Sequence, residues 1–112
     1  MHASGLLLVS AIAACGNTQR GEPKAPELRP ASAEVAMGEK LFRRFCYQCH
    51  PNGQGGLGPA INDKPLPEVA IRTQIRKGVG AMPSFDDSWL SDDEVAAIAE
   101  YVQALRSAPS GR

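Results

Sequence analysis

An all-α fold, with three to four short helices joined by long loops rich in Gly and Pro, is predicted for this chain of 112 residues. Two observations favour it. Three stretches of helix-forming residues carry apolar side chains at helical spacing, and no stretch alternates with the period of two that a half-buried strand shows. Residues 51–67 contain repeated Gly and Pro, which interrupt regular structure and predict a loop.

The first helix is predicted over residues 33–44, a run of good helix formers that follows Pro30. Gly38, Phe42 and Phe45 lie four and three residues apart, so they share one face of this helix. We expect the helix to end at Cys46, which follows directly.

Two further helices are marked by their ends. Residues 68–77 are compatible with a helix that stops at Gly78, since glycine is common just after a helix. Ser91 and Glu94 form a capping-box pattern, in which each side chain accepts a hydrogen bond from the backbone of the other residue. The apolar face of this last helix is then formed by Val95, Ile98, Val102 and Leu105.

The composition indicates one small domain with few large side chains. The chain has 12 basic and 12 acidic residues, and this zero net charge argues against a nucleic-acid partner, which favours a basic patch. It contains three Phe, two Tyr and one Trp, and small domains often gain stability from a metal, a disulfide or a cofactor. Three cysteines, Cys15, Cys46 and Cys49, do not suit a simple disulfide framework.

The N-terminal residues have features of an export signal. The apolar run at residues 6–14 is much shorter than the stretch of about 20 residues that spans a bilayer, but it suits the hydrophobic part of a signal peptide. Ile12, Ala13 and Ala14 precede Cys15, a pattern that resembles the bacterial lipobox. The resemblance implies a signal peptide over residues 1–14, cleavage before Cys15 and lipidation of Cys15.

Two other interpretations stay open, because residues 1–5 lack the Lys or Arg with which signal peptides normally begin. Residues 1–14 would then be an ordinary signal peptide, in which Cys15 is incidental, or an N-terminal helix. The lipoprotein interpretation places the protein on the periplasmic side of a bacterial membrane, anchored there by its lipid.

The remaining chain divides into a linker, a folded domain and a tail. Residues 15–31 are rich in Pro, Gly and charge and contain a single Leu, so they bury too little apolar surface to fold and are predicted to be a flexible linker. Residues 32–108 are predicted to form the folded domain. Residues 109–112, which include a Pro and a Gly, are predicted to be a disordered tail.

Residues 46–50, with the sequence CYQCH, hold two thiols and an imidazole. A structural zinc site usually takes four protein ligands, and the only other histidine is His2, so ligands would be missing. A dithiol redox pair opens a helix in a strand-rich fold, whereas a helix is predicted to end here. Haem c attachment uses this pattern, because the thiols add to the two vinyl groups of haem and the next imidazole falls beneath the iron.

Residues 33–107 resemble a class I cytochrome c of the small bacterial monohaem type. The features that carry the resemblance are Gly38 and Phe42 ahead of CYQCH, the pairs Gly58-Pro59 and Met82-Pro83, and a closing helix with Tyr101, Val102 and Leu105. The resemblance implies a cytochrome c fold wrapped around one covalently bound haem c. The loop at residues 55–59 also resembles haem domains attached to bacterial terminal oxidases and dehydrogenases.

The resemblance assigns a role to each residue of the site. Cys46 and Cys49 would form the thioether bonds to haem, and His50 and Met82 would be the axial ligands of its iron. The carbonyl of Pro59 would accept a hydrogen bond from the His50 ring, which fixes the tautomer and raises the basicity of the ligand.

Other residues of the domain are expected to support this site. Met37 is the alternative methionine ligand, but it falls inside the first helix rather than in a loop. Gly38 and Tyr101 are expected where the first and last helices cross. Candidates for the haem pocket and core are Phe42, Phe45, Ile71, Ile75, Trp89, Leu90, Ile98 and Leu105.

A one-electron carrier is the function that the resemblance implies, rather than an enzyme, because iron with two axial ligands has no open position for a substrate. It would act as a tethered monomer between periplasmic or membrane redox proteins, such as a terminal oxidase or a dehydrogenase. Two alternatives remain: an enzyme or a gas or redox sensor in which the Met82 ligand is labile, and a haem subunit of a larger oxidoreductase. Basic clusters at residues 40–44 and 72–77 and an acidic one at 86–94 either steer a partner or form a solvated face.

Overall fold

The computed structural model describes residue 21 and residues 32–109, and it contains three α-helices and one short 3-10 helix. These are α1 (Ala33–Phe45), η1 (Pro51–Gly53), α2 (Glu68–Lys77) and α3 (Asp92–Ser107). Within this described part no strand is present, and an isolated bridge joins Val79 and Met82. The prediction of an all-α class is therefore confirmed. The predicted signal peptide, Cys15, almost all of the linker and residues 110–112 lie outside the described residues.

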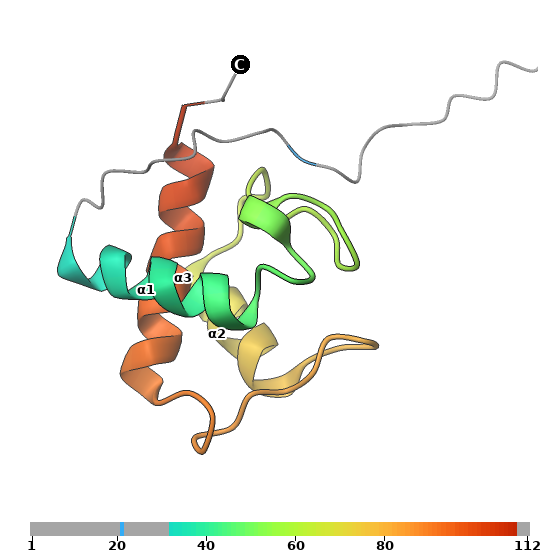
Figure 1. Cartoon of the computed structure of the whole chain (residues 1–112), viewed down its shortest axis with the longest axis vertical. Helices are drawn as coiled ribbons and strands as arrows, with labels where there is room; N and C mark the ends of the chain where they lie inside the picture. Colours follow the sequence, from blue (N-terminus) through green and yellow to red (C-terminus); the bar gives the residue numbers. More distant parts are fainter. Residues whose placement is uncertain (1–20, 22–31, 110–112) are drawn as a thin grey trace, which may run out of the picture.

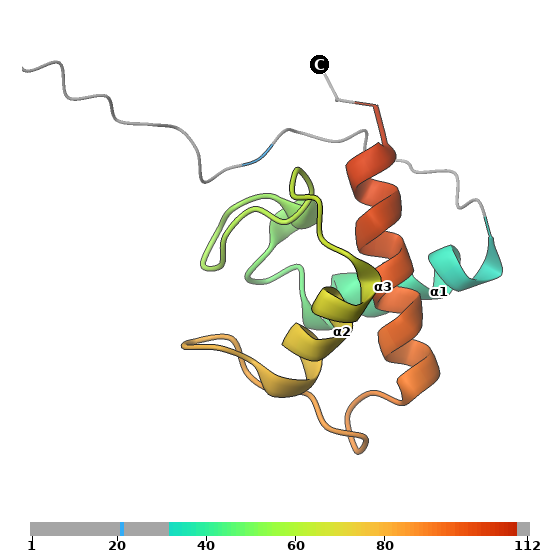
Figure 2. The ribbon, with the colours of Figure 1, turned by 180° about the vertical axis from the view of Figure 1, so that it is seen from behind.

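Helix α3 runs through the middle of the domain, and the other two helices pack against it. α1 crosses α3 (Figure 1), and α2 lies along the face of α3 that is seen in Figure 2. Among the described residues, no helix is both long and apolar enough to cross a membrane.

Capping groups define the ends of the helices. The hydroxyl of Ser32 accepts from the Val35 N–H at 3.1 Å and begins α1. Ser91 and Glu94 form the predicted capping box at the start of α3, with distances of 3.3 and 2.8 Å. At the end of α2, Gly78 has a φ of 63°, a conformation that favours glycine.

The crossing of α1 and α3 depends on Gly38, as the sequence predicted. A Cβ at this position would overlap the carbonyl oxygen of Ala97 and would lie 2.9 Å from the Cβ of Tyr101. One turn further along α1, the ring of Phe42 packs on that of Tyr101 with a centroid distance of 5.2 Å. This contact fixes the second half of α1 on α3, and Cys46, which follows α1, packs on the core.

Most of the residues predicted for the haem pocket and core are buried, but Trp89 is not part of the core. Its side chain is 64% exposed, whereas the neighbouring Leu90 is only 1% exposed. The N–H groups of both residues donate to the carbonyl of Asp86, and in this tight turn Leu90 faces the core while Trp89 faces away from it. The predicted residues that are buried or pack on the core are Phe42, Phe45, Ile71, Ile75, Leu90, Ile98 and Leu105.

Candidate functional site

The CYQCH segment forms a tight turn directly after α1. The N–H of Cys46 donates to the carbonyl of Phe42 at 2.8 Å and closes the helix. The N–H groups of Cys49 and His50 then donate back to the carbonyl of Cys46, at 3.1 and 2.9 Å. The turn therefore holds both thiols and the imidazole within one short stretch at the end of α1.

The two cysteines of the turn are partly buried and are not joined to each other by a disulfide. Burial raises the pKa of the Cys46 thiol to about 12, and the neighbouring Cys49 contributes to the shift. Thiols that exchange disulfides have a lowered pKa, because the thiolate is the reactive form. The environment of Cys46 therefore does not suit the alternative of a dithiol redox pair.

His50 is held in a fixed orientation by the loop that follows. The imidazole is 8% exposed, and its Nδ1 lies 2.8 Å from the carbonyl oxygen of Pro59, which is the contact that the sequence predicted. A carbonyl oxygen only accepts hydrogen bonds, so Nδ1 carries the proton and Nε2 carries the free lone pair. Gly58 lies against the ring, since a Cβ there would be 2.9 Å from Nε2 and 3.0 Å from Nδ1.

Met82 lies in the loop that joins α2 to α3. Backbone hydrogen bonds between Val79 and Met82, at 3.1 and 2.9 Å, close a tight turn around Gly80. Met82 is partly buried as a residue, and its sulfur accepts an exposed hydrogen bond from the Gln74 amide at 3.8 Å. Met37, the alternative ligand, is an exposed residue of α1 and lies in no such loop.

Two loops project from the same side of the three helices, as both views show (Figures 1 and 2). One contains residues 51–67 and carries Gly58 and Pro59, which hold His50. The other contains residues 78–84 and carries Met82. The loop that holds His50 and the loop that carries Met82 are far apart in the sequence, yet they lie on one side of the domain.

The chemistry of these donors fits haem c. Two neighbouring thiols provide the groups that form thioether bonds, the Nε2 of His50 is left to bind iron, and the thioether of Met82 is a soft ligand. In the part of the chain that the structure describes, no group of three or more His, Cys, Asp or Glu side chains is placed to hold a metal ion. A zinc site would therefore lack ligands there.

Sequence comparison identifies the class of protein. The family described as cytochrome c oxidase, cbb3-type, subunit III matches residues 33–102, which is more than half of the 112 residues. The chain therefore belongs to the cytochrome c family. Its cofactor is haem c, and with one CYQCH motif it is a monohaem, electron-carrying protein of the class I type.

The individual relatives include a subunit of a dehydrogenase and a cytochrome c6. The chain is 33% identical over 75 residues to the cytochrome c subunit of 4-cresol dehydrogenase from Pseudomonas putida, a match that covers 67% of this chain and 66% of that subunit. It is 37% identical over 81 residues to cytochrome c6 from Cyanidioschyzon merolae, covering 65% of this chain and 76% of the relative.

Solved structures show the same two similarities, to cytochrome c6 and to a cresol-oxidising enzyme. Cytochrome c6 from the diatom Phaeodactylum tricornutum has a TM-score of 0.58 and 35% identity, and the match covers 65% of this chain and 94% of the diatom protein. A chain of p-cresol methylhydroxylase with substrate bound has a TM-score of 0.55 and 34% identity, covering 70% of this chain and all of that one. The predicted cytochrome c fold is therefore confirmed.

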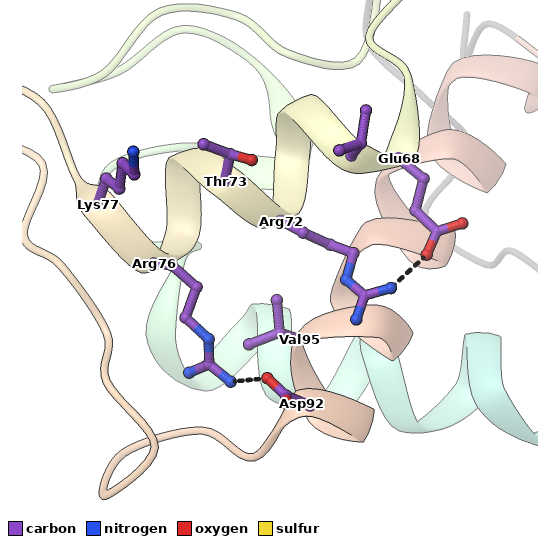
Figure 3. A pocket seen from close by; sticks show the side chains of 8 residues that line it. Glu68, Arg72, Thr73, Arg76, Lys77, Asp92 and Val95 are labelled. Atoms are coloured by element: carbon purple, nitrogen blue, oxygen red, sulfur yellow. Dashed lines mark hydrogen bonds and ion pairs between the residues drawn. The ribbon is translucent and has the colours of Figure 1, made fainter.

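An open groove of about 620 Å³ lies away from the site, between α2 and the start of α3 (Figure 3). Arg72 and Arg76 project into it from α2, and they pair with Glu68 and Asp92. The pair of Arg72 and Glu68 has the i, i+4 spacing of neighbours on one helix. The contacts of Arg76 depend instead on the path of the loop between α2 and α3, for which the sequence carries no local signal.

Proposed function

We propose that this c-type cytochrome is a membrane-tethered, monomeric one-electron carrier that exchanges electrons with periplasmic or membrane redox proteins. Cys46 and Cys49 hold haem through thioether bonds, and His50 and Met82 are the axial ligands. The observation that carries this assignment is the 2.8 Å contact between Nδ1 of His50 and the carbonyl of Pro59. It keeps the proton on Nδ1 and leaves the lone pair of Nε2 available, as a ligand to iron requires.

The residues around the ligands suit electron exchange rather than substrate chemistry. Haem c, when bound, supplies the one-electron couple. The hydrogen bond from His50 to Pro59 keeps the imidazole oriented in both oxidation states. The thioether of Met82 favours the reduced state relative to a second imidazole. Gly80 and Ala81 are small and exposed, so a partner protein approaches this side of the loop closely.

Lipidation of Cys15 supplies the tether in this proposal. Support comes from the lipobox-like residues 12–15 and from the polar linker that follows them. A lipid on Cys15 and a flexible linker confine the domain to a membrane surface on the periplasmic side. Confinement raises the effective concentration of the cytochrome near a membrane-bound donor or acceptor.

A second candidate is a haem subunit that accepts electrons from a dehydrogenase or delivers them to a terminal oxidase. The similarity to the cytochrome c subunit of 4-cresol dehydrogenase favours it, and so does the matched family description. The two candidates differ in the lifetime of the complex. A permanent subunit co-purifies with its dehydrogenase or oxidase from gently solubilised membranes, whereas a free carrier separates from its partners.

The test of the proposal uses the full chain, made in a bacterial host that attaches haem c. Mass spectrometry of the mature protein reports the masses of one haem and of the lipid together. A reduced-minus-oxidised spectrum and a pyridine haemochrome assay report thioether-linked haem. A folded mature protein that carries no haem after production in such a host would refute the assignment.

A further inference from the structure

Arg76, in the last turn of α2, reaches across to the segment that follows Met82. Its side chain is 23% exposed. One terminal nitrogen donates to the carbonyl of Phe85 at 3.0 Å and to the carbonyl of Leu90 at 2.7 Å. One guanidinium thus holds both ends of the turn at residues 85–90.

The other terminal nitrogen forms ion pairs with the carboxylates of Asp92, at 2.6 Å, and Asp87, at 3.0 Å. These carboxylates are 80% and 87% exposed, so solvent screening makes the two ion pairs weak. The bonds to the carbonyls matter more, because Leu90 is 1% exposed and a buried acceptor without a donor is strongly unfavourable. The planar fork of arginine carries its donors on separate nitrogens, so one binds the two carbonyls while the other pairs with the two carboxylates, whereas lysine carries its three donors on one nitrogen.

The segment that carries Met82 leaves α2 and returns to it. It departs at Gly78 and closes the Val79–Met82 turn. It returns where the N–H of Phe85 donates to the carbonyl of Ile75 at 2.9 Å. Arg76 is the neighbour of Ile75 and binds the carbonyl of Phe85, so Phe85 is held to α2 through both its N–H and its carbonyl.

We propose that Arg76 is a positioning residue for the Met82 ligand. By fixing the returning arm of the loop at Phe85 and Leu90, it limits how far the Met82 thioether moves away from the iron. It thereby determines whether the protein behaves as a six-coordinate electron carrier or admits external ligands. The inference rests on the proposed role of Met82 as an axial ligand.

The test compares Arg76→Gln with Arg72→Gln in the holoprotein. Arg72 lies one turn earlier on α2 and forms a half-exposed ion pair with Glu68 at 3.2 Å, so Arg72→Gln controls for loss of charge from the helix. The probes are the near-infrared band of methionine-ligated ferric haem and the rate at which carbon monoxide binds the ferrous protein. Arg76→Gln is expected to weaken the band and to speed carbon monoxide binding about tenfold, whereas Arg72→Gln stays near the wild type.

Arg76→Lys tests the guanidinium group separately from its positive charge. It is also the variant to measure if Arg76→Gln does not fold. It keeps the positive charge, but its single nitrogen stands nearer the backbone and has three N–H donors for the four acceptors that Arg76 contacts, so the bonds to the two carbonyls are weakened. We expect it to bind carbon monoxide faster than the wild type. A wild-type rate in Arg76→Lys, or equal rates in Arg76→Gln and Arg72→Gln, would overturn the inference.

Failure of the ligand assignment is recognised separately. A wild-type protein without the near-infrared band, or a Met82→Ala variant that retains it, overturns the role of Met82 and this inference together. The inference about Arg76 alone is overturned by a different set of results. In that case the wild type shows the near-infrared band and Met82→Ala lacks it, but Arg76→Gln has the band and the carbon monoxide binding rate of the wild type.

Discussion

The backbone of Gly38 in α1 lies against the carbonyl oxygen of Ala97 in α3, with no room for a side chain between them. Glycine inside a helix lowers its stability by up to about 1 kcal/mol relative to alanine. The close approach of the two helices therefore explains why a glycine stands here. The same approach seats α1 on α3 and so positions Cys46, which follows α1 directly.

Gly38→Ala is expected to lower the free energy of unfolding by about 1–3 kcal/mol, because the added methyl group forces the helices apart. In an exposed helix the same substitution would raise stability, so the sign of the change tests the contact. Denaturant unfolding of the holoprotein measures it. The control is Met37→Ala, at the adjacent exposed position, which is expected to change stability by no more than about 0.5 kcal/mol. A Gly38→Ala protein as stable as the wild type would contradict the close crossing.

Gly58→Ala is expected to raise the midpoint potential, because a Cβ would press on the His50 ring and weaken its bond to Pro59. The hydrogen bond from His50 to Pro59 raises the basicity of the imidazole, so the ring donates more electron density to the iron. Stronger electron donation favours the ferric state. A loss of about 1 kcal/mol corresponds to about 40 mV for a one-electron couple. Potentiometric titration measures the shift, with the exposed neighbour Leu57→Ala as control. An unchanged or lower midpoint potential in Gly58→Ala would show that the hydrogen bond from the His50 ring to Pro59 does not require glycine at position 58.

The ends of the helices were predictable from the sequence, because capping is a local property. Ser91 and Glu94 satisfy each other's backbone groups within one turn, and Gly78 supplies a conformation that ends α2. The contact between His50 and Pro59 was also anticipated, but only through the resemblance to a family. Spacing alone does not indicate that a carbonyl nine residues away reaches the ring.

The arrangement of the loop between α2 and α3 was not predictable in the same way. Arg76 contacts residues nine to sixteen positions further along the chain, and no local pattern marks these pairs. Trp89, a candidate for the haem pocket and core, is 64% exposed and lies outside the core. The direction of a side chain in an irregular turn depends on which neighbour enters the core, and here that neighbour is Leu90.

Ser88→Ala is expected to raise the pKa of Asp86. The hydroxyl and the N–H of Ser88 both donate to the Asp86 carboxylate and hold its pKa below the ordinary value. A lowered pKa in the folded protein contributes stability above the unfolded value of about 3.9, and this contribution is lost as the pH falls through the folded pKa. Carboxyl titration by NMR measures the shift, and Ser84→Ala, in the same loop, is the control. If the pKa of Asp86 is the same in the wild type and in Ser88→Ala, the hydroxyl does not hold the carboxylate.

Cys15→Ser is expected to move the protein from the membrane fraction to the soluble fraction of the periplasm, since the lipid on Cys15 is the proposed anchor. Fractionation of cells and metabolic labelling with a fatty acid measure the change. Haem attachment at Cys46 and Cys49 should continue normally, which separates loss of the anchor from loss of the cytochrome. Continued lipid labelling of Cys15→Ser would contradict the anchor.

Met82→Ala is expected to keep haem attached, because the thioether bonds to Cys46 and Cys49 do not involve the methionine. The midpoint potential should fall by on the order of 0.1 V or more, since axial ligands set the potential over a wide range and a methionine ligand raises it. Met37→Ala is the matched control, because Met37 is the alternative ligand and stands exposed on α1. If Met37→Ala rather than Met82→Ala lowers the potential and abolishes the near-infrared band, the loop at residues 78–84 does not supply the ligand, and the iron is bound from α1 instead.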